Sequence, residues 1–202
     1  MAVDLPEGAF TPGPEHWYWL GGRPALDYVN TLRERWRRSA DCLTSDADVV
    51  EWLVRAEVLV APLRAPRGIL AQARELREAI DAGVCAAVDG RAPDAAALAH
   101  VDRWLARAAL PPRLVPGPDG LPLLEEHAAA AAPLAALGLV ALDAARMLGT
   151  PAERARVRIC ASGTCSARFY DRSPAGRRRW CSMAQCGNVA KARRHRARKE
   201  LA

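Results

Sequence analysis

Four of the six cysteines in this 202-residue chain lie close together near its C-terminal end. They form two pairs, Cys160 with Cys165 and Cys181 with Cys186. Four residues separate the members of each pair, and fifteen residues separate the pairs. Two short-spaced pairs joined by a loop are typical of a structural zinc site with four thiolate ligands. Because this segment is too small and too charged to fold on apolar contacts alone, we expect one structural Zn2+ rather than four unrelated cysteines.

The surroundings of the cysteines favour the same interpretation. Gly163 lies within the first pair, where it favours a tight turn whose amides point back at the thiolates, and the second pair marks the start of a terminal helix. The nearby arginines that would favour the thiolate form are Arg158, Arg168 and Arg179. Cys42 and Cys85 stand alone and are expected to be ordinary buried thiols. A catalytic zinc keeps an open coordination position, which four cysteines would close, and nothing in the sequence requires His195 as a substitute ligand.

The chain divides into an acidic body and a basic C-terminal part. Residues 151–202 contain 14 lysines and arginines but three acidic residues, a net charge of +11; the first 150 residues carry −5 within the total of +6. This asymmetry indicates an anionic partner for the basic part. We therefore expect two domains, a helical domain over residues 1–151 and a zinc finger over residues 152–202. The preference for arginine over lysine, together with the many alanines, indicates a GC-rich bacterial genome.

Basic residues flank the second cysteine pair on both sides. Those that we expect to contact nucleic acid are Arg177, Arg178, Arg179, Lys191, Arg193, Arg194, Arg196 and Arg198. A helix with positive charge on most faces has little surface for a core but suits a phosphate backbone. Double-stranded DNA is favoured over RNA, because the exposed aromatic side chains that single-strand readers need are scarce. A solvated tail, or a surface for another acidic macromolecule, remains the alternative.

Half of the residues are hydrophobic and many of these are alanine, which favours a mainly α-helical fold. The first predicted helix begins near Pro24 and continues through Trp36, with apolar residues at helical spacing. On the helix that follows Asp94, Leu98 and Val101 fall on one apolar face. The other predicted elements are a short strand over residues 16–20, helices after Ser45 and Pro66, a β-hairpin over residues 114–124, a helix over residues 125–148 with a kink at Pro133, finger strands over residues 156–159 and 169–170, and a helix from Ser182 to Glu200.

The sequence also bears on cellular location. No run of about 18 uninterrupted apolar residues is present, which argues against a conventional membrane span. The first residues have neither the positive start nor the apolar centre of a secretory signal. We therefore expect a cytoplasmic protein, in which clustered cysteines bind metal rather than form disulfides.

Two stretches at opposite ends resemble a known bacterial family. The first is GGRPALDYVNTL (residues 21–32); the second comprises RWCSM (179–183), CGN (186–188) and AKARR (190–194). Together they resemble the CGNR zinc-finger proteins with an N-terminal ABATE domain, a family of stress-induced transcription regulators. The resemblance implies that the whole chain belongs to this family. The chain departs from the Cys-Gly-Asn-Arg pattern at Val189, which puts specific DNA recognition in doubt but not metal binding.

The N-terminal motif contains a candidate effector site. Arg23, Asp27, Asn30 and Thr31 fall within about one turn of the first helix, where they could bind a small effector. The alternative is structural: Arg23 pairs with Asp27, and Asn30 fixes neighbouring backbone. A glycine pair before a helix is weak evidence for phosphate binding.

Three classes of function follow from these observations. The first is a DNA-binding transcription regulator, whose helical body serves as sensor or dimerisation domain. A homodimer fits this class, because one small finger rarely gives operator-level affinity. The second is a non-enzymatic adaptor that binds RNA or an acidic protein through the same finger. An enzyme ranks third, because none of the four histidines forms a recognisable catalytic motif.

Overall fold

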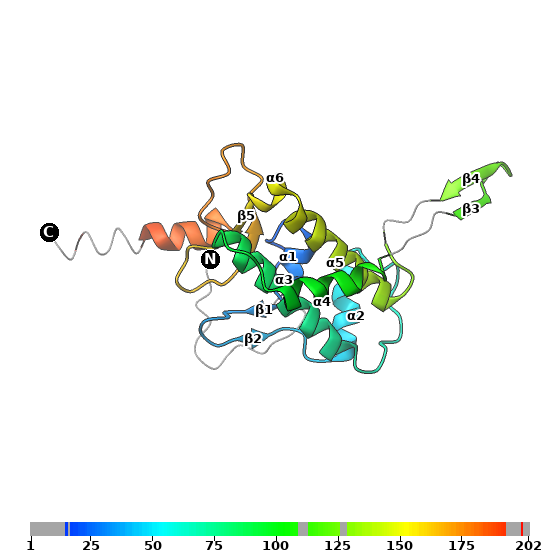
Figure 1. Ribbon diagram of the computed structural model, residues 1–202, viewed down its shortest axis with the longest axis horizontal. Helices are drawn as coiled ribbons and strands as arrows, with labels where there is room; N and C mark the ends of the chain where they lie inside the picture. Colours follow the sequence, from blue (N-terminus) through cyan, green and yellow to red (C-terminus); the bar gives the residue numbers. More distant parts are fainter. Residues whose placement is uncertain (1–14, 16, 109–112, 126–128, 193–198, 200–202) are drawn as a thin grey trace.

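The computed structural model describes residues 15, 17–108, 113–125, 129–192 and 199. In this part the protein is mainly α-helical, as the sequence predicts, and it contains three two-stranded antiparallel sheets, of which the sequence predicts the second and the third. The helices of the first 150 residues form a body, and the C-terminal segment forms a small finger at one side of it (Figure 1). The predicted strand at residues 16–20 does not form over residues 17–20. None of the described helices is both long and apolar enough to cross a membrane.

The first helix is much shorter than the sequence predicts. Helix α1 (Pro24–Val29) has its proline in the first turn, as expected, but it ends well before Trp36. The chain instead forms the paired strands β1 (Leu32–Arg33) and β2 (Ala40–Asp41), and Trp36 lies in the loop between them, 49% exposed. Glu34 adopts a left-handed φ of 48°, which no residue within an α-helix has. The prediction of a helix through Trp36 is therefore wrong.

Helix α2 (Asp46–Arg55) begins where the sequence predicts. The Ser45 hydroxyl accepts a hydrogen bond from the Asp48 amide at 3.1 Å, and the Asp48 carboxylate accepts one from the Ser45 amide at 2.9 Å. This reciprocal capping box satisfies donors that a helix start leaves without partners. The helix buries Trp52 in the core.

Helices α3 (Ile69–Val88) and α4 (Ala95–Leu105) follow Pro66 and Asp94 as predicted. The apolar residues that recur at helical spacing along α3 are all buried; they are Ile69, Ala73, Leu76, Ile80 and Val84. On α4 only part of the predicted face is buried, since Leu98 is 50% exposed whereas Val101 packs against the core. Apolar spacing therefore identifies α4, but it does not show which of its apolar residues are covered.

Helix α5 (Pro133–Gly149) begins at the proline, so the prediction of a helix from Glu125 with a kink at Pro133 is wrong. Proline suits the first helical position because the amide it lacks would have no helical partner there. Glu125 instead ends strand β4 (Pro122–Glu125), which pairs with β3 (Arg113–Pro116) in the predicted hairpin. Figure 1 shows this hairpin extending away from the helical body.

The finger follows α5 directly. Helix α6 (Pro151–Arg154) leads into strand β5 (Val157–Ile159), which pairs with β6 (Arg168–Tyr170), as the sequence predicts. The predicted terminal helix starts as one wide turn, η2 (Met183–Gly187), and continues as α-helix over residues 188–192. Strand β6 packs against α1 and β5 against α3, so the finger contacts the body along two helices.

Candidate metal centre and nucleic-acid interface

The four clustered cysteines meet at one point of the finger. Their Sγ atoms all lie within 4.8 Å of one another. The Sγ atom of Cys181 lies 3.8 Å from that of Cys165 and 3.7 Å from that of Cys186. A tetrahedral Zn2+ with Zn–S bonds of about 2.3 Å requires sulfur atoms about 3.8 Å apart. Cys160, Cys165, Cys181 and Cys186 therefore fit one structural zinc ion, and four thiolates complete its coordination shell.

Backbone hydrogen bonds position the first cysteine pair. Strand β5 leads into Cys160, whose amide donates to the Ala167 carbonyl at 2.9 Å, and the Cys165 amide closes the turn on the Ser162 carbonyl at 3.1 Å. The Ala167 amide donates to the Cys165 sulfur at 3.5 Å, a contact that favours a thiolate. Gly163 has open space around its α-carbon and no left-handed φ, so this turn does not require the glycine that the sequence suggests.

The second pair is held by the wide turn η2. The Ser182 hydroxyl accepts a hydrogen bond from the Gln185 amide at 3.3 Å, and the Ser182 carbonyl accepts one from the Cys186 amide at 3.0 Å. Gly187 follows the last ligand in close packing, because a β-carbon there would lie 2.8 Å from the Met183 sulfur. Only glycine fits this position without a shift of its neighbours.

The four thiols cannot all ionise unaided. Contact with Cys165 lowers the pKa of Cys160, whereas contact with Cys160 and Cys165 raises the pKa of Cys181. One thiolate forms at the expense of another because like charges this close repel. A bound dication would compensate all four charges together, which agrees with the fit of the sulfur positions to zinc.

Two of the arginines expected beside the thiolates have other partners. The Arg158 guanidinium donates to backbone carbonyls, among them that of Gly176 at 2.9 Å. Arg168 is 3% exposed and forms a bidentate ion pair with Asp81 on α3, at 2.6 and 3.0 Å. Arg168 therefore holds the finger to the body rather than tuning the metal site.

The basic residues before Cys181 differ in exposure. Arg177 and Arg179 are exposed. Arg178 is half-buried: its guanidinium donates to the Cys181 carbonyl at 2.7 Å and lies over the ring of Phe169. Arg178 thus braces the metal site, whereas its two neighbours present their charge to solvent.

Beyond the last ligand, Lys191 is exposed on the terminal helix. Val189, at the position where the family pattern has arginine, is half-buried. Several residues predicted to bind nucleic acid lie outside the described residues; they are Arg193, Arg194, Arg196 and Arg198. Of the eight basic residues that the sequence singles out, the exposed ones among those described are therefore Arg177, Arg179 and Lys191.

The N-terminal motif forms the joint between body and finger. The Asn30 side chain donates to the Arg168 carbonyl at 2.9 Å and accepts from the Arg168 amide at 2.8 Å, so it pairs with β6 as a strand would. Thr31 is 1% exposed and its hydroxyl donates to the Tyr28 carbonyl at 2.7 Å. Both side chains are buried, so neither is available to a diffusing effector.

Arg23 and Asp27 do not pair with each other. Arg23 forms ion pairs with Asp143 on α5, at 2.6 Å, and with Glu153 on α6. The Asp27 carboxylate accepts a hydrogen bond from the Gly21 amide at 2.7 Å, and its burial raises the pKa of Asp27 to about 6. Both residues also line a small hollow of about 340 Å³ beside α2. Of the four predicted effector residues, Arg23 and Asp27 therefore border this hollow.

Sequence reasoning missed Asp81, although it forms a buried ion pair with Arg168 of the finger. Asp81 lies on the predicted helix α3, but it is separated from Arg168 by 87 residues. The only available signal was a charged residue inside an apolar segment, which does not identify its partner.

Two protein-family models match the chain, one in the helical body and one in the finger. The ABATE model, described as "Putative stress-induced transcription regulator", matches residues 22–151. The CGNR zinc-finger model matches residues 156–199. These are regulator and zinc-finger families, not families of enzymes. No curated protein matches the chain.

Proposed function

Since the chain belongs to the ABATE family and carries a CGNR zinc finger, we propose that it is a stress-responsive transcription regulator that binds double-stranded DNA through its finger. One observation carries this proposal: exposed basic residues lie on both sides of the second pair of metal ligands. Arg177 and Arg179 precede Cys181, and Lys191 follows Cys186 on the terminal helix. The metal site thereby fixes the two basic segments relative to each other.

Zinc supplies a cross-link between the two halves of the finger when it is bound. The protein's own residues do the rest. The capping turn at Ser182 starts the terminal helix, Arg178 braces the loop that carries Arg177 and Arg179, and the Asn30 amide fixes the finger to the body. We assign Arg177, Arg179, Lys191 and the arginines that follow Lys191 to phosphate contacts.

The acidic body serves a different role. With a net charge of −5 over residues 1–150, it does not attract a phosphate backbone. We propose that it senses a signal and brings two chains together. Support for a homodimer comes from the β3–β4 hairpin, where Leu114 is 73% exposed, since an isolated two-stranded hairpin is only marginally stable without a packing partner. We propose no catalytic activity.

An adaptor that binds RNA or an acidic protein is the second candidate. The chemistry of the finger favours DNA, because readers of single-stranded RNA stack bases on exposed aromatic rings. Phe169 is fully buried, and Trp180 is half-buried beside the Arg179 guanidinium. The finger therefore offers charge rather than a stacking surface.

Binding of labelled duplex DNA at several salt concentrations tests this assignment. Replacement of Arg177, Arg179 and Lys191 by glutamine should weaken binding and reduce the slope of log affinity against log salt by about 2 to 3, because each lost phosphate contact removes about 0.9. The matched control replaces three exposed arginines of the body, Arg64, Arg67 and Arg146. Equal effects of the two triple variants would contradict a DNA surface on the finger.

A further inference from the structure

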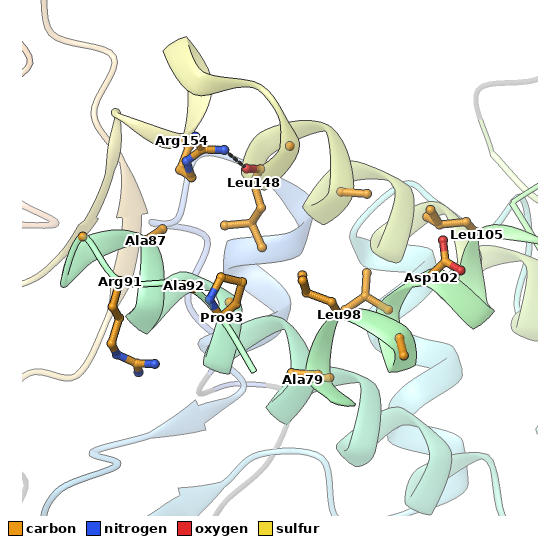
Figure 2. Close-up of a pocket in the computed structure, with 17 residues that line it drawn as sticks. Ala79, Ala87, Arg91, Ala92, Pro93, Leu98, Asp102, Leu105, Leu148 and Arg154 are labelled. Carbon is orange, nitrogen blue, oxygen red and sulfur yellow. Dashed lines mark hydrogen bonds between the residues drawn. The ribbon is translucent and has the colours of Figure 1, made fainter. Parts of the chain in front are cut away.

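A larger hollow lies on the body, between helices α3, α4 and α5 (Figure 2), and its lining includes none of the four clustered cysteines. Its volume is about 860 Å³, within the range of about 300–1,000 Å³ that pockets for small ligands have. Most of its lining is apolar. The residues with the largest apolar side chains are Leu98, Val101, Leu105 and Leu148.

The hollow exists because small residues line the facing helices. Alanines and Gly83 on α3, with Ala145 on α5, leave space that larger side chains would fill. At one wall α3 and α5 are in close contact, since a β-carbon on Gly83 would lie 2.8 Å from Leu148. In Figure 2 the Leu148 side chain points into the space above Pro93 and Leu98. The half-exposed Leu98 thus belongs to the pocket wall.

The two ends of the pocket differ in charge. Arg91 and Arg154 lie at one end, and Asp102 lies beside Leu105 at the other (Figure 2). The Arg154 guanidinium donates to the Leu148 carbonyl at 2.6 Å. Within the part of the chain that the structure describes, it has no carboxylate partner. An anionic group is therefore favoured at the Arg154 end and disfavoured at the Asp102 end.

We propose that this pocket binds a small amphipathic carboxylic acid, with its apolar part against Leu98 and Leu148 and its carboxylate on Arg154. Arginine binds carboxylates through two parallel hydrogen bonds. The Leu148 carbonyl occupies one terminal nitrogen of the Arg154 guanidinium, so the other two nitrogens remain available to donate to a carboxylate. The apolar lining supplies the binding energy and the arginine sets the orientation.

The position of the pocket connects it with the finger. Ala79, Gly83 and Ala87 of α3 line the hollow, while Asp81 and Cys85 of the same helix contact Arg168 of the finger. A ligand that shifts α3 would therefore alter the contact between α3 and Arg168 of the finger. An effect on DNA binding rests on the proposed function, whereas ligand binding itself does not.

Titration calorimetry of the zinc-loaded full chain with decanoate, and with the uncharged alcohol decanol, tests the proposal. Decanoate should bind more tightly than decanol, and Arg154→Gln should weaken decanoate binding about tenfold while leaving decanol unchanged. Ala145→Phe should fill the hollow and abolish binding of both. Ala71→Phe, at an exposed position of α3 outside the pocket, should bind as the natural chain does.

Circular dichroism and zinc content identify any variant that fails to fold. Should Ala145→Phe unfold, Leu98→Lys serves instead, because Leu98 is half exposed and its replacement places a charge in the apolar wall. Absence of decanoate binding, or equal binding by Arg154→Gln, would overturn the proposal. A dimer that dissociates in Ala145→Phe, without decanoate binding to the natural chain, would show instead that a second copy covers the hollow.

Discussion

The side-chain amide of Asn30 joins two parts of the chain that are 138 residues apart in sequence. It satisfies both the amide and the carbonyl of Arg168, and Asn30 itself is 3% exposed. Buried backbone groups without partners are costly, so this side chain stabilises the packing of β6 against α1. The motif that suggests an effector site at the sequence level thus has a structural role at Asn30.

Asn30→Ala should lower the free energy of unfolding by about 2 to 4 kcal/mol, because it leaves a buried donor and a buried acceptor without partners. Chemical denaturation of the zinc-loaded chain measures the change. Asn188→Ala is the control, since the Asn188 amide makes one long hydrogen bond at an exposed site. Equal stability of the two variants would show that Asn30 does not hold the finger.

Asp27 should make the stability of the protein depend on pH. Burial raises its pKa from an ordinary value of 3.8 to about 6, so the folded state binds the proton more tightly than the unfolded state. Stability contributed by the protonated form is therefore lost as the pH rises through about 4 to 6. Asp27→Asn keeps an acceptor for the Gly21 amide but cannot ionise. The free energy of unfolding of the Asp27→Asn variant, compared with that of the natural chain at the same pH, should rise by about 1 to 1.5 kcal/mol between pH 5 and pH 8.

Denaturation of both proteins across this pH range checks the prediction. Zinc release at low pH affects both in the same way, so the difference between them isolates Asp27. A difference that stays constant with pH would show that Asp27 is ionised throughout the range.

At the scale of elements, the turn η2 places the last zinc ligand at the start of the terminal helix. The turn packs closely: a β-carbon on Gly187 would meet the Met183 sulfur at 2.8 Å and the Trp180 ring at 3.2 Å. Gly163 in the first pair has open space instead. Gly163 therefore has room for a side chain, whereas a side chain at Gly187 would require its neighbours to move.

Gly187→Ala should displace the exposed end of the Met183 side chain and crowd the Trp180 ring, and should therefore weaken zinc binding more than Gly163→Ala does. Gly163→Ala should leave the zinc affinity unchanged, because its new methyl group meets nothing. Competition with a chromogenic zinc chelator measures both affinities. Loss of zinc by the Gly163 variant, but not by the Gly187 variant, would reverse this assignment.

Local signals in the sequence predict element boundaries where the determining contacts are themselves local. The Ser45 capping box starts α2 and the cysteine spacing identifies the metal site, because each depends on residues close together in the chain. Two boundaries fail for specific reasons. Helix α1 ends early because Arg77 of α3 donates hydrogen bonds to Thr31 and to Asp41 of β2. Arg77 is 46 residues from Thr31 in the sequence, so no local signal reveals this contact. Helix α5 starts late because Pro133 suits a helix start better than a helix interior.

For the molecule as a whole, a buried ion pair connects the finger with the body, and further ion pairs within the body support it. Arg168 pairs with Asp81, and Asp81 also pairs with Arg35 at 3.2 Å. On the same helix, Arg77 pairs with Asp41 at 2.7 Å. Burial alone would raise the pKa of Asp41, but hydrogen bonds from Arg77 hold it below its ordinary value. Removal of one partner from such a buried pair is strongly destabilising.

Cys181→Ser should therefore affect both parts of the protein. Loss of a ligand releases zinc and unfolds the finger, because the metal supplies much of the folding energy of a small module. The body keeps its helices but loses the packing of β6 and the Asp81–Arg168 pair, so its melting temperature should fall by several degrees. Cys42→Ala, which changes a cysteine outside the metal site, should retain one zinc per chain. An unchanged melting temperature for the body of the Cys181 variant would show that the two parts are energetically independent.

The central claim is that zinc organises a basic finger for binding to duplex DNA. Fluorescence anisotropy of labelled duplex DNA tests it most directly, with zinc-loaded protein, after chelation and after zinc is restored. We predict binding that weakens steeply with salt, disappears on chelation and returns with zinc. Absence of binding at low salt, or binding of equal strength without zinc, would contradict the claim.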